Sequence, residues 1–362
     1  MSGVYVHIPF CLHKCDYCDF LSFEGSGRSV QEAYVAALLQ EIKAAKNEFT
    51  SPISTIYFGG GTPTALPSPL LCKILAELGS LPLSRGVEVT VEANPGTIDV
   101  SYLRALRQHG ATRLSLGLQS THAHLLENIN RRQNTPAFFT SYRDAQVAGF
   151  ININVDLMFG LPGQTMAQWA QSVGEVVALA PSHISAYSLT LAPGTPLWQQ
   201  EEDGVLVLPN DELDRRMYHY MVQVLGDAGY NHYELSNFAK PGMQSRHNVD
   251  CWTRAPYRGF GLGAHSFCER TRWHNTESLD DYIAGDTGRY GVELLTDDDA
   301  DVEYMMLGLR LIRGVPLDGV PAAHIEKVQS LMRRGLLTQR GAFVCLTPQG
   351  LDLANQVFGS FI

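Results

Sequence analysis

The sequence predicts an α/β protein, with a partial (β/α)6 TIM-like barrel, an α+β extension and a small helical, winged-helix-like C-terminal domain. Short β-rich segments alternate with amphipathic helical segments six times in the first half of the chain. Three of these β segments keep one polar face. After about residue 205 the alternation stops, and the chain ends in the order helix, hairpin, helix.

Six consecutive βα units predict a parallel sheet with helices outside it, and the pattern leaves both a partial barrel and an open doubly wound sheet as solutions. The clearest helix is expected over residues 30–49, where Tyr34, Val35, Leu38, Leu39 and Ile42 share a face. The six strands are expected over residues 4–9, 54–58, 87–92, 113–119, 152–159 and 183–191.

The third, fourth and fifth strands carry polar residues on alternate positions, with Glu92, Gln119 and Asp156 near their C-terminal ends. A parallel strand that is buried on both faces is normally apolar throughout. The alternation therefore favours a barrel interior that holds a polar ligand. In the fifth strand the apolar face is expected to begin at Ile151. The alternative is a set of strands with one face in solvent.

The remainder divides into two parts, so that the expected domains are residues 1–205, 206–292 and 293–362. The connecting part holds a helix over 212–226 and a glycine- and aromatic-rich stretch over 230–273. The last part opens with a helix from Asp297 to Arg313, whose acidic residues suit a helix N-terminus. A helix over 321–334, a hairpin over 336–346 and a helix over 348–358 follow.

Composition excludes several classes of protein. The formal net charge of the 362 residues is −10 and no long basic run occurs, which argues against nucleic acid or an anionic membrane as the main partner. No apolar run approaches the roughly 20 residues that span a bilayer, and the first residues do not resemble a secretion signal. Seven cysteines, an odd number, fit a cytoplasmic protein without a disulfide framework.

Cys11, Cys15 and Cys18 follow directly on the first strand. Thiolates at such short spacing let one loop hold one iron–sulfur cluster, and three ligands leave one iron of a cubane open to a cosubstrate. The alternatives are a zinc site completed by His7 or His13, and three free thiols. The other cysteines are Cys72, Cys251, Cys268 and Cys345, and all but Cys251 are expected to be packing thiols.

Several motifs, in order along nearly the whole chain, resemble the radical S-adenosylmethionine (SAM) family of the coproporphyrinogen dehydrogenase HemN. Besides the cysteine run they are Tyr57-Phe58-Gly59-Gly60-Gly61-Thr62-Pro63, Glu92-Ala93-Asn94-Pro95, Gly117-Leu118-Gln119-Ser120, Asn130-Arg131 and Asp156-Leu157-Met158-Phe159-Gly160-Leu161-Pro162.

The resemblance implies a 4Fe-4S cluster on Cys11, Cys15 and Cys18, and a bound SAM that the reduced cluster cleaves to a 5′-deoxyadenosyl radical. Tyr17 would flank the adenine, and Asp156 would bind ribose hydroxyls. The residues implied to bind SAM are Tyr5, Tyr17, Gly60, Gly61, Thr62, Glu92, Gln119, Arg131 and Asp156.

Two branches of this family differ near the cluster. The dehydrogenase has a fourth cysteine two residues beyond the third, where this chain has Phe20. It also has an N-terminal extension, whereas here the first strand begins at Val4. Both differences favour the haem chaperone branch, HemW. An oxygen-independent coproporphyrinogen III oxidase is the runner-up, and a cluster-based redox sensor that uses the C-terminal module is a third class.

The chaperone branch implies haem as a further ligand and apo-haemoproteins, soluble or membrane-bound, as recipients. Its His-Asn-x-x-Tyr-Trp motif corresponds to residues 247–252, with Cys251 in place of the tyrosine. His247 and Cys251 are therefore candidate axial ligands, and His265 is another. The alternative for His247 is a hydrogen-bonded histidine that organises a loop. Gln133 stands where this branch commonly has histidine. The oligomeric state and the recipient protein stay open.

Overall fold

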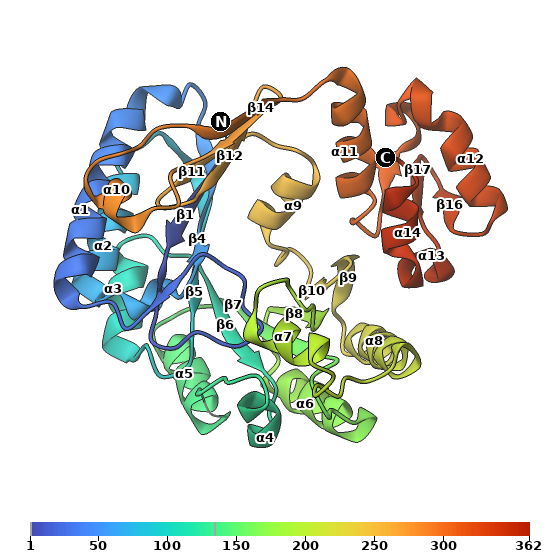
Figure 1. Ribbon diagram of the computed structural model, residues 1–362, viewed down its shortest axis with the longest axis horizontal. Coiled ribbons are helices and arrows are strands. Elements are labelled where there is room, and N and C mark those ends of the chain that lie inside the picture. Colours follow the sequence, from blue (N-terminus) through green and yellow to red (C-terminus); the bar gives the residue numbers. More distant parts are fainter. Residues whose placement is uncertain (1, 134) are drawn as a thin grey trace.

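The computed structural model describes residues 2–133 and 135–362. Six parallel strands form the centre of a twelve-stranded sheet that curves into a partial barrel (Figure 1). The six expected strands are thereby confirmed, as is the partial barrel. In spatial order they are β1 (Gly3–Ile8), β4 (Ile53–Gly60), β5 (Leu83–Ala93), β6 (Arg113–Gln119), β7 (Asn152–Phe159) and β8 (His183–Ser188).

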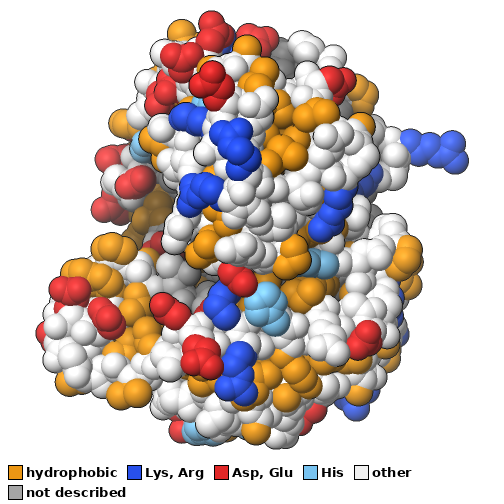
Figure 2. All heavy atoms as spheres, turned by 90° about the vertical axis from the view of Figure 1, so that its right-hand side faces the viewer, with side chains coloured by type: hydrophobic (Ala, Val, Ile, Leu, Met, Phe, Trp, Pro, Cys, Tyr) orange, Lys and Arg blue, Asp and Glu red, His pale blue; other side chains and the backbone are white. Residues whose placement is uncertain are grey.

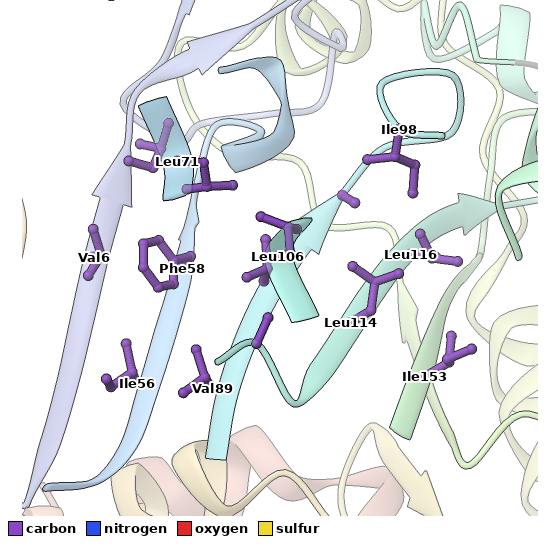
Figure 3. Close-up of a cluster of buried hydrophobic side chains, with 14 of the residues drawn as sticks. Val6, Ile56, Phe58, Leu71, Val89, Ile98, Leu106, Leu114, Leu116 and Ile153 are labelled. Carbon is purple, nitrogen blue, oxygen red and sulfur yellow. The ribbon is translucent and has the colours of Figure 1, made fainter. Parts of the chain in front are cut away.

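Helices cover the outer face of these strands (Figure 1). Figure 3 shows apolar side chains of neighbouring strands, such as Val6, Phe58 and Leu114, in one cluster with Leu71 and Leu106 from the helices. This burial of apolar faces is the main stabilising contribution to the barrel. The helices are α1 (Arg28–Ala44) with η1 (Ala45–Glu48), α2 (Ser68–Leu78), α3 (Val100–Gln108), α4 (Ala123–Glu127), α5 (Thr135–Val147), α6 (Met166–Leu179) and α7 (Pro196–Glu202).

The polar faces of the strands point into the barrel and are enclosed there. Thr90, Ser115 and Asn154 are at most 3% exposed. The alternative of a solvated face is therefore wrong. The apolar face of β7 starts one alternation later than expected, because Ile151 lies before the strand and is 77% exposed.

Residues 206–292 add strands to both edges of the barrel sheet. After α8 (Asp211–Asp227), β9 (Asn231–Glu234) and β10 (Asn237–Ala239) extend the β8 edge, and β11 (Tyr257–Phe260) pairs in parallel with β1. A short helix, α9 (Arg246–Trp252), lies between the two edges (Figure 1). The other elements of this part are β12 (His265–Cys268), β13 (Thr271–His274), α10 (Leu279–Ile283) and β14 (Tyr290–Leu294).

The C-terminal domain has its own apolar core and the expected winged-helix-like order of elements. Its first helix, α11 (Asp297–Gly308), ends before the expected Arg313, because the chain turns at Gly314 (φ 73°) to enter a strand. Figure 2 shows the side of the molecule on which the C-terminal domain lies, where acidic and basic side chains are interspersed with hydrophobic ones. The remaining elements are β15 (Val315–Pro316), η3 (Leu317–Gly319), η4 (Ala322–His324), α12 (Ile325–Arg333), β16 (Leu337–Arg340), β17 (Phe343–Leu346), α13 (Pro348–Asp352) and α14 (Ala354–Gly359).

Within the described ranges, no helix combines the length and the apolar character needed to cross a bilayer.

Candidate functional site

The three clustered cysteines lie on one loop at the C-terminal end of β1. The loop is closed by the pairing of β2 (Phe10–Cys11) with β3 (Phe23–Glu24). Cys11, Cys15 and Cys18 all line one cavity in the mouth of the barrel. Among the described residues, no three side chains of His, Cys, Asp or Glu are grouped to hold a single metal ion. A cubane does not require such a group, because each thiolate binds a different iron.

The zinc alternative needs a histidine ligand. His7 has protein partners at both ring nitrogens: Nδ1 is 3.0 Å from the Tyr5 hydroxyl, and Nε2 is 2.8 Å from the Leu21 carbonyl oxygen. His13 lines the cavity with its Nδ1 2.9 Å from a carboxylate oxygen of Glu24, and its buried Nε2 has no hydrogen-bond partner in the part of the chain that the structure describes, so His13 is free to act as a ligand. The described residues nevertheless do not group three such ligands around a single metal position. The arrangement therefore favours the cluster, for which three thiolates suffice.

Burial raises the pKa of the Cys11 thiol and raises that of Cys18 to about 11. Both thiols are protonated at neutral pH in the metal-free protein, so cluster binding must displace their protons. The guanidinium of Arg131 lies 3.8 Å from the Cys15 sulfur and is only 5% exposed.

The glycines at the end of β4 bring backbone close to the cysteine loop. A Cβ on Gly61 would lie 2.7 Å from the Phe10 carbonyl oxygen and 3.0 Å from the Cys11 sulfur. At Gly60, where φ is +105°, a Cβ would meet the His7 ring at 2.6 Å. Only glycine permits this approach. It leaves exposed backbone beside the cluster loop, which suits the methionyl end of SAM.

Half-buried carboxyl side chains of β5 and β7 line the same cavity as the glycines. Glu92 accepts a 2.6 Å hydrogen bond from Tyr57, and burial raises the pKa of this carboxyl to about 7. Asp156 accepts from Asn154 at 2.7 Å and from Ser115 at 3.3 Å, and burial raises its pKa as well. These carboxylates can accept hydrogen bonds from the amino and hydroxyl groups of a ligand.

Gln119 enters the cavity at an irregularity in β6. Its φ is +68°, and the register between β6 and β7 shifts between Gly117 and Gln119. The two-residue period of the strand already places Gln119 on the inward face with Ser115 and Gly117, and the bulge bends the backbone there. The Tyr187 hydroxyl donates to Oε1 of Gln119 at 3.1 Å and holds the amide in place.

Most residues expected to bind SAM meet in this cavity, with one exception. Tyr5 does not line it, because its hydroxyl faces His7. The lining also includes residues that were not expected to bind SAM, among them Asn94, Ser115 and Tyr187. Asn94 links Thr62 (2.7 Å) to Arg131 (2.8 Å), and its place beside Glu92 in a quoted motif was an available signal. The expected residues that line the cavity are Tyr17, Gly60, Gly61, Thr62, Glu92, Gln119, Arg131 and Asp156.

These thiols, backbone cradle and carboxylates fit a 4Fe-4S cluster with SAM. The chemistry that this pair supplies is the one-electron cleavage of a carbon–sulfur bond of SAM.

The two candidate haem ligands of α9 have different surroundings. His247 is 6% exposed, its Nδ1 lies 3.0 Å from the Thr55 hydroxyl, and its ring stacks on Tyr57 at 5.2 Å. Burial lowers the pKa of His247 to about 4, so the ring is neutral at pH 7. Cys251 instead lines a second cavity, and burial raises its pKa to about 11. These contacts agree with the alternative in which His247 organises the structure.

The second cavity, of about 390 Å³, lies between α9, β11, β12 and α11. His265 also lines it. Its walls combine apolar side chains with arginines. They include Trp252, Arg254, Tyr257, Phe267, Arg272, Glu303, Met306 and Leu307.

Comparisons with known proteins agree with this architecture. Residues 5–176 match the radical SAM superfamily and residues 295–353 the HemN C-terminal domain. The structure of coproporphyrinogen III oxidase (HemN) from Escherichia coli is similar, with a TM-score of 0.84 over 99% of this chain and 89% of that one; at 23% identity this likeness shows the fold.

Curated relatives that carry the name heme chaperone HemW are closer in sequence. The protein from Bacillus subtilis is 37% identical over 100% of this chain and 99% of its own length. That from Escherichia coli is 34% identical over 73% of this chain and 69% of its own length. Membership of the radical SAM superfamily implies a 4Fe-4S cluster and SAM. The chain belongs to the HemW family of radical SAM proteins.

Proposed function

We propose that this protein is a haem chaperone, which binds a 4Fe-4S cluster, SAM and haem and delivers haem to haemoproteins. The name of its relatives supports the proposal. The observation that carries it within this structure is the second cavity, because α9 there presents Cys251 beside apolar walls and arginines.

Haem combines a flat apolar ring with two propionates and an iron that needs an axial ligand. Trp252 and Phe267 offer apolar surface. Arg254 and Arg272 are both paired with Glu303, and they would exchange that carboxylate for the propionates. Cys251 and His265 line the cavity and are the favoured axial ligands. His247 remains a third candidate, although it must first release Thr55 and leave its buried site.

The runner-up activity is oxygen-independent oxidation of coproporphyrinogen III. The retained SAM cavity supports it. Phe20 stands at the position of the fourth cysteine of that enzyme, lines the cavity and is 60% exposed.

The first experiment titrates anaerobically reconstituted protein with hemin, follows the Soret band, and then adds an apo-haemoprotein as acceptor. We expect stoichiometric haem binding and transfer. A parallel mixture of coproporphyrinogen, SAM and reductant should yield no protoporphyrinogen. Several turnovers of that product, or no haem binding, would contradict the chaperone.

The ligand is located by the variants Cys251→Ala, His265→Ala and His247→Ala. The true ligand's variant should change the Soret maximum and lower haem affinity. The matched controls are Cys268→Ala, a half-buried cysteine of β12 that does not line the cavity, and His109→Ala, an exposed histidine at the end of α3. Both should leave the spectrum unchanged.

A further inference from the structure

A chain of four hydrogen bonds, three of them buried and the one to Asp156 partly buried, links the SAM cavity to the N-terminus of α9. The backbone N–H of Ser245 donates to the Tyr233 hydroxyl (3.3 Å), which donates to Nε2 of His183 (2.8 Å). Nδ1 of His183 donates to Oδ1 of Asn154 (2.6 Å), and Nδ2 of Asn154 donates to Oδ1 of Asp156 (2.7 Å). Asp156 lines the cavity, and Ser245 is the N-cap of α9.

The direction of this chain is determined by the amide of Asn154. Its Nδ2 can only donate and its Oδ1 can only accept. His183 must therefore donate through Nδ1, which leaves Nε2 to accept from the Tyr233 hydroxyl. Burial and nearby Arg113 hold the pKa of His183 well below its ordinary value, so the ring is neutral, as the chain requires. Hydrogen bonds aligned in one direction polarise and strengthen one another.

No competing solvent reaches the middle of the chain. His183 and Ser245 are 0% exposed, Asn154 is 1% exposed and Tyr233 is 7% exposed. Asn154 has no spare capacity at its donors, since its Nδ2 also donates to Ser115 at 2.7 Å. Asp156 itself is half-buried in the cavity, but behind it a change in its orientation must be accommodated by Asn154 rather than by water.

The far end of the chain holds the helix that carries the candidate haem ligands. The Ser245 hydroxyl accepts from the backbone N–H of Asn248 and caps α9. The Glu88 carboxylate accepts from the backbone N–H groups of Arg246 and His247, at 3.1 Å each. With seven residues α9 is too short to be stable alone, so these hydrogen bonds at its N-terminus help to keep the helix formed.

We infer that Tyr233 is a positioning residue that couples SAM binding at Asp156 to the order of α9, and thereby to haem binding. Ribose hydroxyls that donate to Oδ2 of Asp156, which also accepts a 3.3 Å hydrogen bond from Ser115, restrict its rotation and hold Oδ1 toward Asn154. Binding of either ligand then orders this series of hydrogen bonds. The second ligand no longer bears the entropy cost of that ordering, so each ligand tightens the binding of the other. Linkage makes the effect reciprocal. The haem part of this inference depends on the proposed function, whereas the ordering of α9 by SAM does not.

The test compares amide hydrogen exchange of α9 in anaerobically reconstituted protein with and without SAM. We expect SAM to slow exchange in α9, and in wild-type protein to tighten haem binding about fivefold. Tyr233→Phe removes the hydroxyl that makes two bonds of the chain. It should abolish both effects while SAM still binds. The matched control is Tyr230→Phe, which removes another buried hydroxyl, bonded to the Pro181 carbonyl and outside the chain. It should keep both effects.

Exchange in α9 that does not respond to SAM would overturn the inference, as would an undiminished response in Tyr233→Phe. If SAM protects α9 but no variant or wild type binds haem, the coupling stands and the chaperone proposal falls. The two failures are therefore distinguishable.

Discussion

Gly61→Ala tests whether the glycine backbone at the end of β4 contacts SAM. The new methyl group would lie 2.7 Å from the Phe10 carbonyl oxygen, which is backbone and cannot turn away. Ordinary contact begins at 3.4 Å, so the two segments must separate by about 0.7 Å (3.4 − 2.7). The same methyl group would lie 3.0 Å from the Cys11 sulfur, which places the strain on the cluster loop.

Overpacking of this kind costs about 1–3 kcal/mol. If that strain opposes the SAM-bound geometry, SAM binds roughly five- to 150-fold more weakly. The assay is isothermal titration of anaerobically reconstituted protein with SAM, with iron determined per chain to separate loss of the cluster from loss of SAM.

The matched control is Gly226→Ala in α8, where a Cβ meets nothing within 4 Å. Alanine is favoured over glycine inside a helix by about 1 kcal/mol, so this variant should be slightly more stable and bind SAM normally. A Gly61→Ala protein with full iron content and wild-type SAM affinity would refute the role of the glycine as a close backbone contact.

Three further changes test the buried charges. Arg131→Met leaves the Asn94 and Gly117 oxygens without this donor and should lower SAM affinity or iron retention by tenfold or more. The control Arg132→Met, at an exposed arginine, should change neither. If the two variants bind SAM and iron equally well, Arg131 is not part of the site. Glu41→Ala leaves buried Arg258 with the Glu48 carboxylate still 3.3 Å away, so it should cost up to about 3–5 kcal/mol in urea unfolding. A cost below about 1 kcal/mol would contradict a stabilising role of the Glu41–Arg258 pair. For Glu92, the folded-state pKa of about 7 lies above the ordinary 4.5, so the native state binds the extra proton and cluster-free protein loses stability as pH rises from 4.5 to 7. Glu92→Gln should remove up to about 3 kcal/mol of that loss, and parallel pH profiles of variant and wild type would contradict the raised pKa.

The order of strands, the enclosed polar face and the cysteine loop were predictable because they depend on local patterns. Alternation along a strand has a period of two, which is readable over a few residues. Glu92, Gln119 and Asp156 therefore emerged as cavity residues from periodicity before any resemblance was used. The three cysteines lie within eight residues, so one loop brings them together.

Other features depend on contacts between distant segments. The pairing of β11 with β1, more than 250 residues apart, completes the sheet edge beside the second cavity. Tyr187 joins the SAM cavity from β8, and Tyr233 reaches His183 from β9. Which residues face inward and which loop carries the thiols follow from local sequence, since strand period and ligand spacing are local. The hydrogen bonds that join α9 to Asp156, and the separate surroundings of His247 and Cys251, arise from which sheet edges pair and are visible only in the folded protein.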